Sequence, residues 1–249
     1  MYKISSTLCL LFFSYFNVLA QQKLPEYITK FSAEHPAQKG SFYSIEEANK
    51  KPDKVIFLNL SLGRLNEIPK DILRYKNLKS LSLDYNNIKE IPAWFASLNA
   101  LQDLSLSKNQ LTIFPAVLLK LKKLKTINLS SNNIYGFEKL NANFSIEELY
   151  INLNNISQIP ADLSCFTKLK ILDMGNNKLT FLPGVIFNMP QLEYVHLFRN
   201  EISDFQVVDN PNSNLKGIYL PFNPISDQSV QKLRRMLPNC YISMSLDKP

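Results

Sequence analysis

The chain has 249 residues, of which 45% are hydrophobic, 20% are charged and only 6 are glycine, and this composition excludes collagen-like and disordered proteins. The formal net charge of +7 is compatible with an anionic partner. However, the basic residues are scattered, and their densest run, from Lys120 to Lys125, is interleaved with leucines, as on a solvated face, so we do not expect a nucleic-acid partner.

Residues 1–20 have the pattern of a secretory signal peptide. Lys3 gives a positive start, an apolar stretch runs from Leu8 to Leu19, and small residues lead to a cleavage site after Ala20. The apolar stretch is shorter than the roughly 20 residues that a transmembrane helix needs. We therefore expect a mature protein that is secreted, periplasmic or at the cell surface. The alternative is a buried N-terminal helix.

The next two segments lead into the main body of the chain. Residues 21–43 carry no clear pattern and are predicted to be a loosely ordered leader. Residues 44–54 are predicted to be an N-terminal helical cap, because Ser44 and Glu47 have the spacing of a capping box and Pro52 ends the helix.

Residues 55–237 contain eight copies of one pattern. Clear copies are LKSLSLDYNNI (78–88), LQDLSLSKNQL (101–111) and LKTINLSSNNI (124–134), and VIFLNLSLGRL (55–65) is a weaker first copy. The remaining copies begin at Ile146, Leu169, Leu192 and Leu215. Successive units are 23 residues apart, except for one step of 22. The pattern resembles that of the leucine-rich repeat family, L-x-x-L-x-L-x-x-N-x-L.

Each unit predicts a strand followed by a short helical segment. The alternating apolar pair, such as Leu104 and Leu106, indicates a strand with one face turned inward. A proline that follows, such as Pro92, suits the start of a helical turn, although Glu138 and Gln206 replace it in two units. One unit cannot bury enough apolar surface alone, so the units must stack. The expected fold is an α/β leucine-rich repeat solenoid, a curved horseshoe with a parallel sheet on its concave face and short helical or 3₁₀ segments on its convex face.

An asparagine at the ninth position of each unit is predicted to be structural. Its amide offers two donors and an acceptor where the strand turns, so the copies can form a ladder between units. The predicted ladder is Asn86, Asn109, Asn132, Asn154, Asn177, Asn200 and Asn223.

The chain ends in a second cap and carries two cysteines after the signal peptide. Residues 227–237 are predicted to be an amphipathic helix with Asp227 as its N-cap, and residues 238–249 a C-terminal cap that contains a final strand. Cys165 and Cys240 are three or four strand steps apart, about 15–19 Å, and a disulfide needs Cα atoms within about 7 Å. We expect two separate, mostly buried thiols.

Catalytic and metal-binding motifs are missing from the sequence. There is no HExxH, CxxC, GxSxG or phosphate-binding glycine loop, and after the signal peptide the only histidines are His35 and His196. Asp84, Asp103, Glu148 and Asp173 alternate on the predicted concave face and are expected to form a solvated polar face rather than a catalytic pair. We therefore expect neither an enzyme nor a cofactor.

The outward strand positions change character along the solenoid. They are mostly Ser, Thr and Asn in the early units and become bulky and aromatic in the later ones, a composition typical of interaction hot spots. The predicted ligand-binding residues are Tyr150, Asp173, Tyr194, His196, Phe198, Arg199, Tyr219 and Phe222. The alternative is that these side chains only cover the sheet or pack against residues 206–214.

The sequence therefore predicts a non-catalytic, monomeric module that binds a protein or peptide through its concave face. The resemblance is closest to secreted bacterial members of the family. The Ile-Pro units also resemble intracellular scaffolding and signalling members, and an enzyme or enzyme inhibitor remains a further alternative.

Overall fold

The computed structural model describes residues 39–140 and 145–245. The predicted signal peptide, most of the predicted leader and the last four residues of the predicted C-terminal cap lie outside this part of the chain. Among the helices in these two ranges, none has the length and apolar character needed to cross a bilayer.

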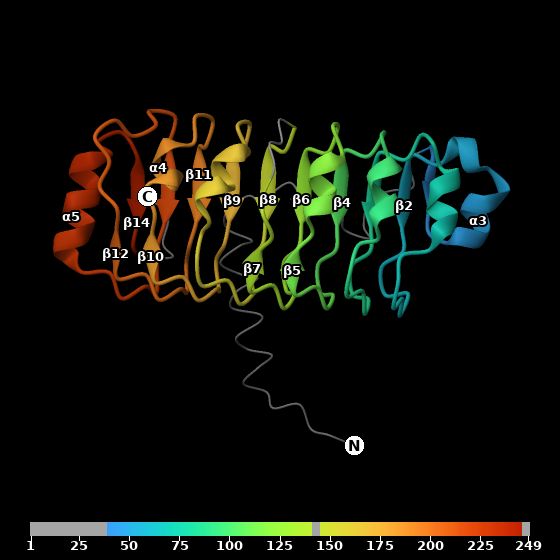
Figure 1. Ribbon diagram of the computed structural model, residues 1–249, viewed down its shortest axis with the longest axis horizontal. Coiled ribbons are helices and arrows are strands. Elements are labelled where there is room, and N and C mark those ends of the chain that lie inside the picture. The colour runs from blue at the N-terminus through green and yellow to red at the C-terminus, as the bar shows by residue number, and fades with distance from the viewer. Residues whose placement is uncertain (1–38, 141–144, 246–249) are drawn as a thin grey trace, which may run out of the picture.

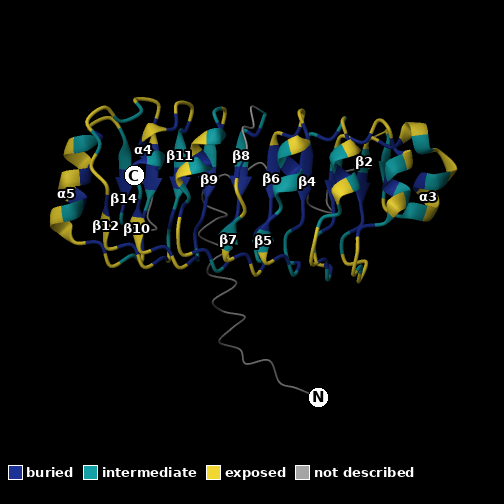
Figure 2. Ribbon diagram, viewed as in Figure 1, coloured by how far each residue is buried: buried dark blue, intermediate teal, exposed yellow. Residues whose placement is uncertain are grey.

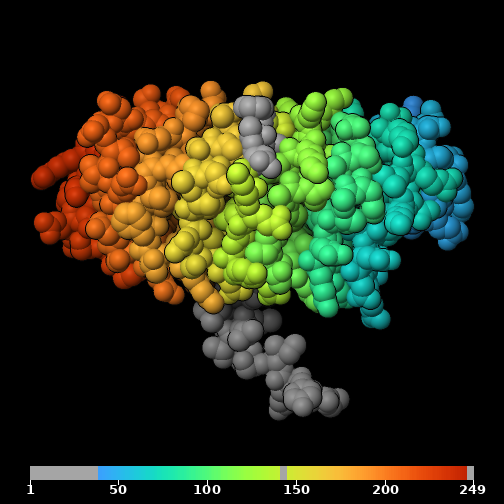
Figure 3. Space-filling model, viewed as in Figure 1, coloured from blue at the N-terminus to red at the C-terminus, as the bar shows by residue number. Residues whose placement is uncertain are grey.

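The centre of the fold is a parallel sheet with one strand from each unit, drawn side by side in Figure 1. Within the described residues the sheet has ten strands, in the order β1-β2-β3-β4-β6-β8-β9-β11-β13-β14. Their bounds are β1 Ser41–Phe42, β2 Phe57–Asn59, β3 Ser80–Ser82, β4 Asp103–Ser105, β6 Thr126–Asn128, β8 Glu148–Tyr150, β9 Ile171–Asp173, β11 Tyr194–His196, β13 Gly217–Tyr219 and β14 Tyr241–Ser243. The strands therefore follow chain order, as expected for stacked repeats, and Figure 3 shows the units as successive bands of colour.

Short helices and minor strands form the layer behind this sheet. The helical segments are α3 Ile45–Lys50, η1 Pro52–Lys54, η2 Lys70–Arg74, η3 Ala93–Ser97, η4 Ala116–Lys120, η5 Ala161–Cys165, α4 Val185–Asn188 and α5 Asp227–Met236. Two small parallel pairs join β5 Ile113–Phe114 to β7 Gly136–Phe137, and β10 Phe181–Leu182 to β12 Asp204–Phe205. The longer helices α3 and α5 stand at opposite ends of the solenoid (Figure 1).

The core lies between the sheet and the helical layer, where the repeated apolar positions meet. Leu104 and Leu106 are fully buried, and so is Phe95 from the helical segment η3. Burial follows the same stripe in every unit, whereas the turns and the outer faces of the end helices are exposed (Figure 2). A continuous core of this kind stabilises units that could not fold singly.

The ninth-position asparagines connect each unit to the unit before it. The Asn132 amide donates to the Leu106 carbonyl oxygen (2.9 Å) and the Leu129 carbonyl oxygen (3.0 Å), and its oxygen accepts from the Leu111 N–H (3.0 Å). The other six asparagines repeat this set of bonds. These backbone carbonyl and N–H groups lie where the chain leaves the strand and have no partner in the sheet, so the asparagine side chain provides their hydrogen bonds.

Proline is the N-cap of four 3₁₀ segments, η2 to η5. Pro69 and Pro92 are the N-caps of η2 and η3. Where Gln206 stands in place of the proline, its side-chain oxygen accepts from the Gly184 N–H at 2.8 Å. The glutamine therefore ties its unit to the previous one by a side-chain bond.

Both ends of the solenoid are capped, with two differences from the predictions. At the N-terminal end, Ser44 caps α3 and accepts from the Glu47 N–H at 3.2 Å, but β1 lies inside the predicted leader 21–43 and pairs with β2. At the other end the predicted N-cap Asp227 is wrong. Ser226 has the extended backbone of an N-cap and accepts from the Ser229 N–H, so Asp227 is the first helical residue.

This cap at α5 provides a direct test. Replacing Ser226 with alanine should lower the free energy of unfolding by about 1 kcal/mol, because the Ser229 N–H loses its acceptor. Replacing Asp227 with alanine should cost about half as much, because only its favourable charge near the helix dipole is lost. Urea unfolding followed by circular dichroism measures both, and a larger loss for Asp227→Ala would restore Asp227 as the cap.

The two cysteines do not form a disulfide with each other. Both side chains are half-buried rather than mostly buried, and burial raises the pKa of Cys240 to about 11. Thiolate chemistry at Cys240 is therefore suppressed at neutral pH.

Candidate binding surface

The parallel register places the outward side chains of successive strands in rows across the sheet. Tyr150 pairs with Asp173, Asp173 with His196, and His196 with Tyr219. Paired positions in neighbouring strands are about 4.8 Å apart, so the four side chains form one row. Backbone pairing alone thus makes four of the predicted site residues consecutive neighbours in this row.

Aromatic rings gather at the C-terminal end of this surface. The rings of His196 and Tyr219 stack with centroids 4.6 Å apart and planes 4° apart, and Tyr241 meets Tyr219 edge-on at 6.1 Å. Tyr194 lies beside them, since an added Cβ at Gly217 would be 3.2 Å from Tyr194 Cδ1 and 3.0 Å from Tyr219 Cε2. We call Tyr194, His196, Tyr219 and Tyr241 the aromatic cluster. Gly217 leaves the space that the two tyrosine rings occupy.

Phe198 lies next to the cluster and covers the neighbouring strand. A Cβ at Gly175 would clash with the Phe198 ring, so this ring rests directly on the Gly175 backbone. Phe198 is half-buried. Gly175 is therefore needed for close approach and not for an unusual backbone angle.

Arg199 and Phe222 lie at the rim of the sheet, in the turn after the strand. Both have left-handed backbones, with φ of 52° and 60°, which costs about 1 kcal/mol for residues with a side chain. Their side chains point outward and meet, with the Arg199 guanidinium 5.3 Å from the Phe222 ring centroid. Phe222 is 60% exposed, so this pair is open to a partner.

Tyr150 differs from the prediction of an exposed contact residue. It is only 3% exposed, and its hydroxyl donates to the Glu148 carboxylate at 3.2 Å. Asp173 is also buried.

Burial perturbs the two titratable groups in the middle of the row. Desolvation raises the pKa of the Asp173 carboxyl to about 7, despite a hydrogen bond from the Gly175 N–H. Desolvation also lowers the pKa of His196 to about 4. At pH 5–6 both groups are therefore neutral in the folded protein.

The acidic face is also less solvated than predicted, and Asp84 is the clearest case. Its carboxylate accepts from the Ser105 hydroxyl (2.5 Å), the Ser107 N–H (2.7 Å) and the Ser82 hydroxyl (3.2 Å). Burial raises the pKa of Asp84 in spite of these donors. These three serines thus form a hydrogen-bonded network around the Asp84 carboxylate rather than a solvated polar surface.

Comparisons with known proteins agree with this geometry. The family model described as Leucine rich repeat matches residues 57–111 and 144–202. The chain belongs to the leucine-rich repeat family. A sequence search of curated proteins found no match.

Solved leucine-rich repeat structures share the fold. A leucine-rich repeat protein of Leptospira interrogans is 28% identical, with a TM-score of 0.58, and the match covers 77% of this chain and 55% of that chain. An internalin of Listeria monocytogenes is 21% identical, with a TM-score of 0.59 and coverages of 84% and 59%. TLR13 in a TLR13–ssRNA13 complex is 24% identical, with a TM-score of 0.67 and coverages of 80% and 30%. This chain therefore spans between 30% and 59% of these three solved chains.

The leucine-rich repeat register also identifies surface residues that the sequence prediction missed. Tyr241 belongs to the aromatic cluster but lies in the strand that was assigned only to the C-terminal cap; aligning it with Gly217 in the row would have revealed it. Leu62, Tyr85 and Leu153 occupy the same left-handed rim position as Phe222 and are exposed. All three directly precede the ninth residue of their unit, and this shared position could have identified them from the sequence.

The alternative packing partner for the aromatic residues, segment 206–214, bonds elsewhere. The Val208 N–H contacts the Met236 sulfur at 3.5 Å, and the Asn212 amide donates to the Leu192 carbonyl oxygen at 2.9 Å. Together with the Gln206 bond described above, these contacts tie the segment to α5 and to the repeats. The rings of the cluster stack on one another instead.

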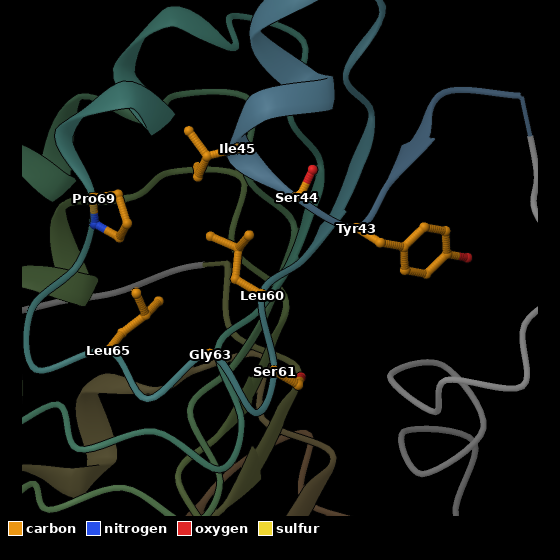
Figure 4. Close-up of a pocket in the computed structure, with 8 residues that line it drawn as sticks. All are labelled: Tyr43, Ser44, Ile45, Leu60, Ser61, Gly63, Leu65 and Pro69. Atoms are coloured by element: carbon orange, nitrogen blue, oxygen red, sulfur yellow. The ribbon is translucent and has the colours of Figure 1, made fainter.

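A hollow of about 230 Å³ lies at the opposite end of the solenoid, beside α3. In Figure 4, Ile45, Leu60, Leu65 and Pro69 surround it, while the Tyr43 ring points away. The lining is mostly apolar and contains no titratable group apart from Tyr43. In residues 39–140 and 145–245, no three His, Cys, Asp or Glu side chains gather as metal ligands.

Proposed function

We propose that this leucine-rich repeat protein is a non-catalytic module that binds a protein or peptide through its concave sheet surface, in the secreted or cell-envelope compartment. The observation that carries the proposal is the aromatic cluster, with Phe198 beside it, on an open sheet. Tyrosine and arginine at the centre of an exposed surface are typical of binding hot spots. The leucine-rich repeat fold is a general scaffold for such binding.

A binding role fits the chemistry of the surface better than catalysis. Ser105, Ser107 and Ser82 hold the Asp84 carboxylate as an acceptor, with no histidine beside them to act as a base. His196 has a lowered pKa but stacks on Tyr219, which keeps its ring face occupied. The compartment is inferred from the signal-like residues 1–20, and an envelope-fraction protein that begins at Gln21 would support it.

Site-specific photo-crosslinking tests the binding surface. Benzoylphenylalanine at position 194 should crosslink a partner from the source cells, because this position lies in the aromatic cluster. Benzoylphenylalanine at position 181 is the control, since Phe181 is 45% exposed but lies in β10 behind the sheet. Crosslinking should fall at least tenfold at position 194 when Phe198→Ala and Tyr219→Ala are added.

The control must separate lost binding from lost folding. The combined variant has to keep the wild-type circular dichroism spectrum and a cooperative unfolding transition. Equal crosslinking yields at positions 194 and 181, or an unchanged yield after both alanine substitutions, would contradict binding at the concave surface.

A further inference from the structure

The concave surface carries the opposite charge to the rest of the molecule. In the described strands and the two residues after each, the outward positions hold four carboxylates and no lysine or arginine, although the whole chain has a net charge of +7. The four are Asp84, Asp103, Glu148 and Asp173. Within the described residues, the basic side chains therefore lie outside these outward positions.

Three lysines that directly precede strands of the sheet are paired with glutamates. Glu147 binds both Lys170 (2.7 Å) and Lys125 (3.2 Å), and Glu193 binds Lys216 (2.7 Å). The hydrogen bond from Lys170 is the main cause of the lowered pKa of Glu147. These pairs offset the charge of three lysines beside the sheet.

One side-chain acceptor near the centre of this surface has no hydrogen-bond partner. Among buried side-chain oxygen and nitrogen atoms of the described residues, Asn152 Oδ1 has no hydrogen-bond partner, and Asn152 is 5% exposed. A buried acceptor left in this way costs about 1–3 kcal/mol. Asn152 follows the strand of Glu148 and neighbours the strand of Asp173, so a ligand donor there would give Asn152 Oδ1 its missing partner and lie near both carboxylates.

The aromatic cluster favours the same kind of ligand. Tyrosine rings attract cations through their faces, and Lys216 already lies 6.0 Å from the Tyr194 ring centroid. Carboxylates beside tyrosines attract lysine and arginine side chains and repel phosphate groups. This chemistry disfavours nucleic acid on the concave surface.

The spread of the carboxylates favours a polypeptide over a small cation. Asp84 follows β3 and Asp173 ends β9, four strand steps away, which is about 19 Å at about 4.8 Å a step. An extended peptide rises about 3.3 Å per residue, so about six residues span this distance. A single small cation would contact only one of these positions.

We propose that the concave surface binds a basic, extended polypeptide segment, whose lysine or arginine side chains lie between Glu148, Asp173 and the aromatic cluster. This inference rests on the proposed function and names the chemistry of its partner. The segment would donate to Asn152 Oδ1 and to both carboxylates, and its cationic groups would lie against the tyrosine rings.

Fluorescence anisotropy with defined peptides tests the inference. The probe is a fluorescein-labelled nonapeptide of alternating arginine and serine, compared with its glutamate–serine counterpart and a labelled ten-nucleotide single strand, at 150 mM salt and pH 7.5. The arginine probe should bind best. Its Kd should rise about tenfold in the Glu148→Gln/Asp173→Asn variant, because both charges are lost while shape is kept.

A matched variant controls for the change in net charge. Glu67→Gln/Glu90→Gln removes two charges from exposed positions outside the sheet and should change the Kd less than twofold. Tighter binding of the glutamate probe or the oligonucleotide, or an arginine-probe Kd that does not respond to Glu148→Gln/Asp173→Asn, would overturn the inference. If crosslinking at position 194 still captures a partner in that case, the proposed function stands and only the basic character of the partner is wrong.

Discussion

Replacing Asn132 with alanine should lower the free energy of unfolding by about 3–5 kcal/mol, a large part of the stability of an ordinary domain. The substitution removes the bonds to the Leu106 and Leu129 carbonyl oxygens and to the Leu111 N–H. These backbone groups are buried, and each one left without a partner costs about 1–3 kcal/mol. Because Asn132 joins two units in the middle of the solenoid, the loss also weakens the coupling between the halves.

Asn133 provides a matched control one residue away. Its side chain is exposed, so Asn133→Ala should change the free energy of unfolding by less than about 0.5 kcal/mol. Urea unfolding followed by circular dichroism compares the two variants under the same conditions. Equal midpoints for Asn132→Ala and Asn133→Ala would mean that the asparagine ladder does not stabilise the fold.

The neighbouring residues Asp173 and His196 should show opposite dependences of stability on pH when each is studied alone. In the His196→Gln variant, the raised pKa of Asp173 remains, and in the Asp173→Asn variant the lowered pKa of His196 remains. One proton bound differently in the folded and unfolded states changes stability by about 1.4 kcal/mol per pH unit. The expected change over the acidic range is therefore about 3 kcal/mol in each variant.

The direction of each change follows from proton binding. Between pH 4 and pH 7 folded Asp173 holds a proton that the unfolded chain releases, so His196→Gln should become more stable as the pH falls from 7 to 4. Between pH 4 and pH 6.5 unfolded His196 holds a proton that the folded chain excludes, so Asp173→Asn should become less stable as the pH falls. In the wild type the two contributions oppose each other and largely cancel in this window.

Urea unfolding at pH 4.5, 5.5, 6.5 and 7.5 measures these profiles. The double variant Asp173→Asn/His196→Gln removes both groups and should restore a profile close to that of the wild type. Profiles of the two single variants that run parallel to the wild type would show that neither group has a perturbed pKa. A common slope in all four proteins reports the remaining titratable groups, including Asp84, and does not affect the comparison.

The repeat architecture was predictable because the same sequence pattern recurs in every unit. Leucine alternation identifies the buried side of each strand, and the 23-residue spacing sets the order of strands in the sheet. Proline at positions such as Pro92 marks the starts of the helical segments. Each inference depends only on local sequence and on stacking of equal units, so the fold followed from the sequence without knowledge of distant contacts.

The depth of the candidate surface was not predictable in the same way. Alternation shows that Tyr150 and Asp173 point outward, but it does not reveal that both are buried. The perturbed pKa values of Asp173 and His196 follow from that burial. The local sequence does not show why Gly175 and Gly217 are glycines. The reason is the close approach of the rings of Phe198, Tyr194 and Tyr219.

The ends of the solenoid were predicted less accurately because the repeat stops there. The strand β1 has only two residues and no alternation to detect. Ser226 and Asp227 are both good N-cap residues, and the extended backbone of Ser226 and its bond from the Ser229 N–H decide between them. Both differences are shifts of boundary, and neither changes the order of elements.

The asparagine ladder has a consequence for how this chain can vary in length. Each ladder asparagine forms hydrogen bonds to the preceding unit. Its amide donates to a carbonyl of that unit, and its oxygen accepts from an N–H of that unit, in the same way along the chain. Excising residues 101–123 would join Ala100 to Leu124, and Asn132 would then meet the Leu83 carbonyl and Ile88 N–H that Asn109 meets now. The concave surface can therefore lengthen or shorten by whole units through duplication or deletion, while the asparagine hydrogen bonds between units and the two caps stay the same.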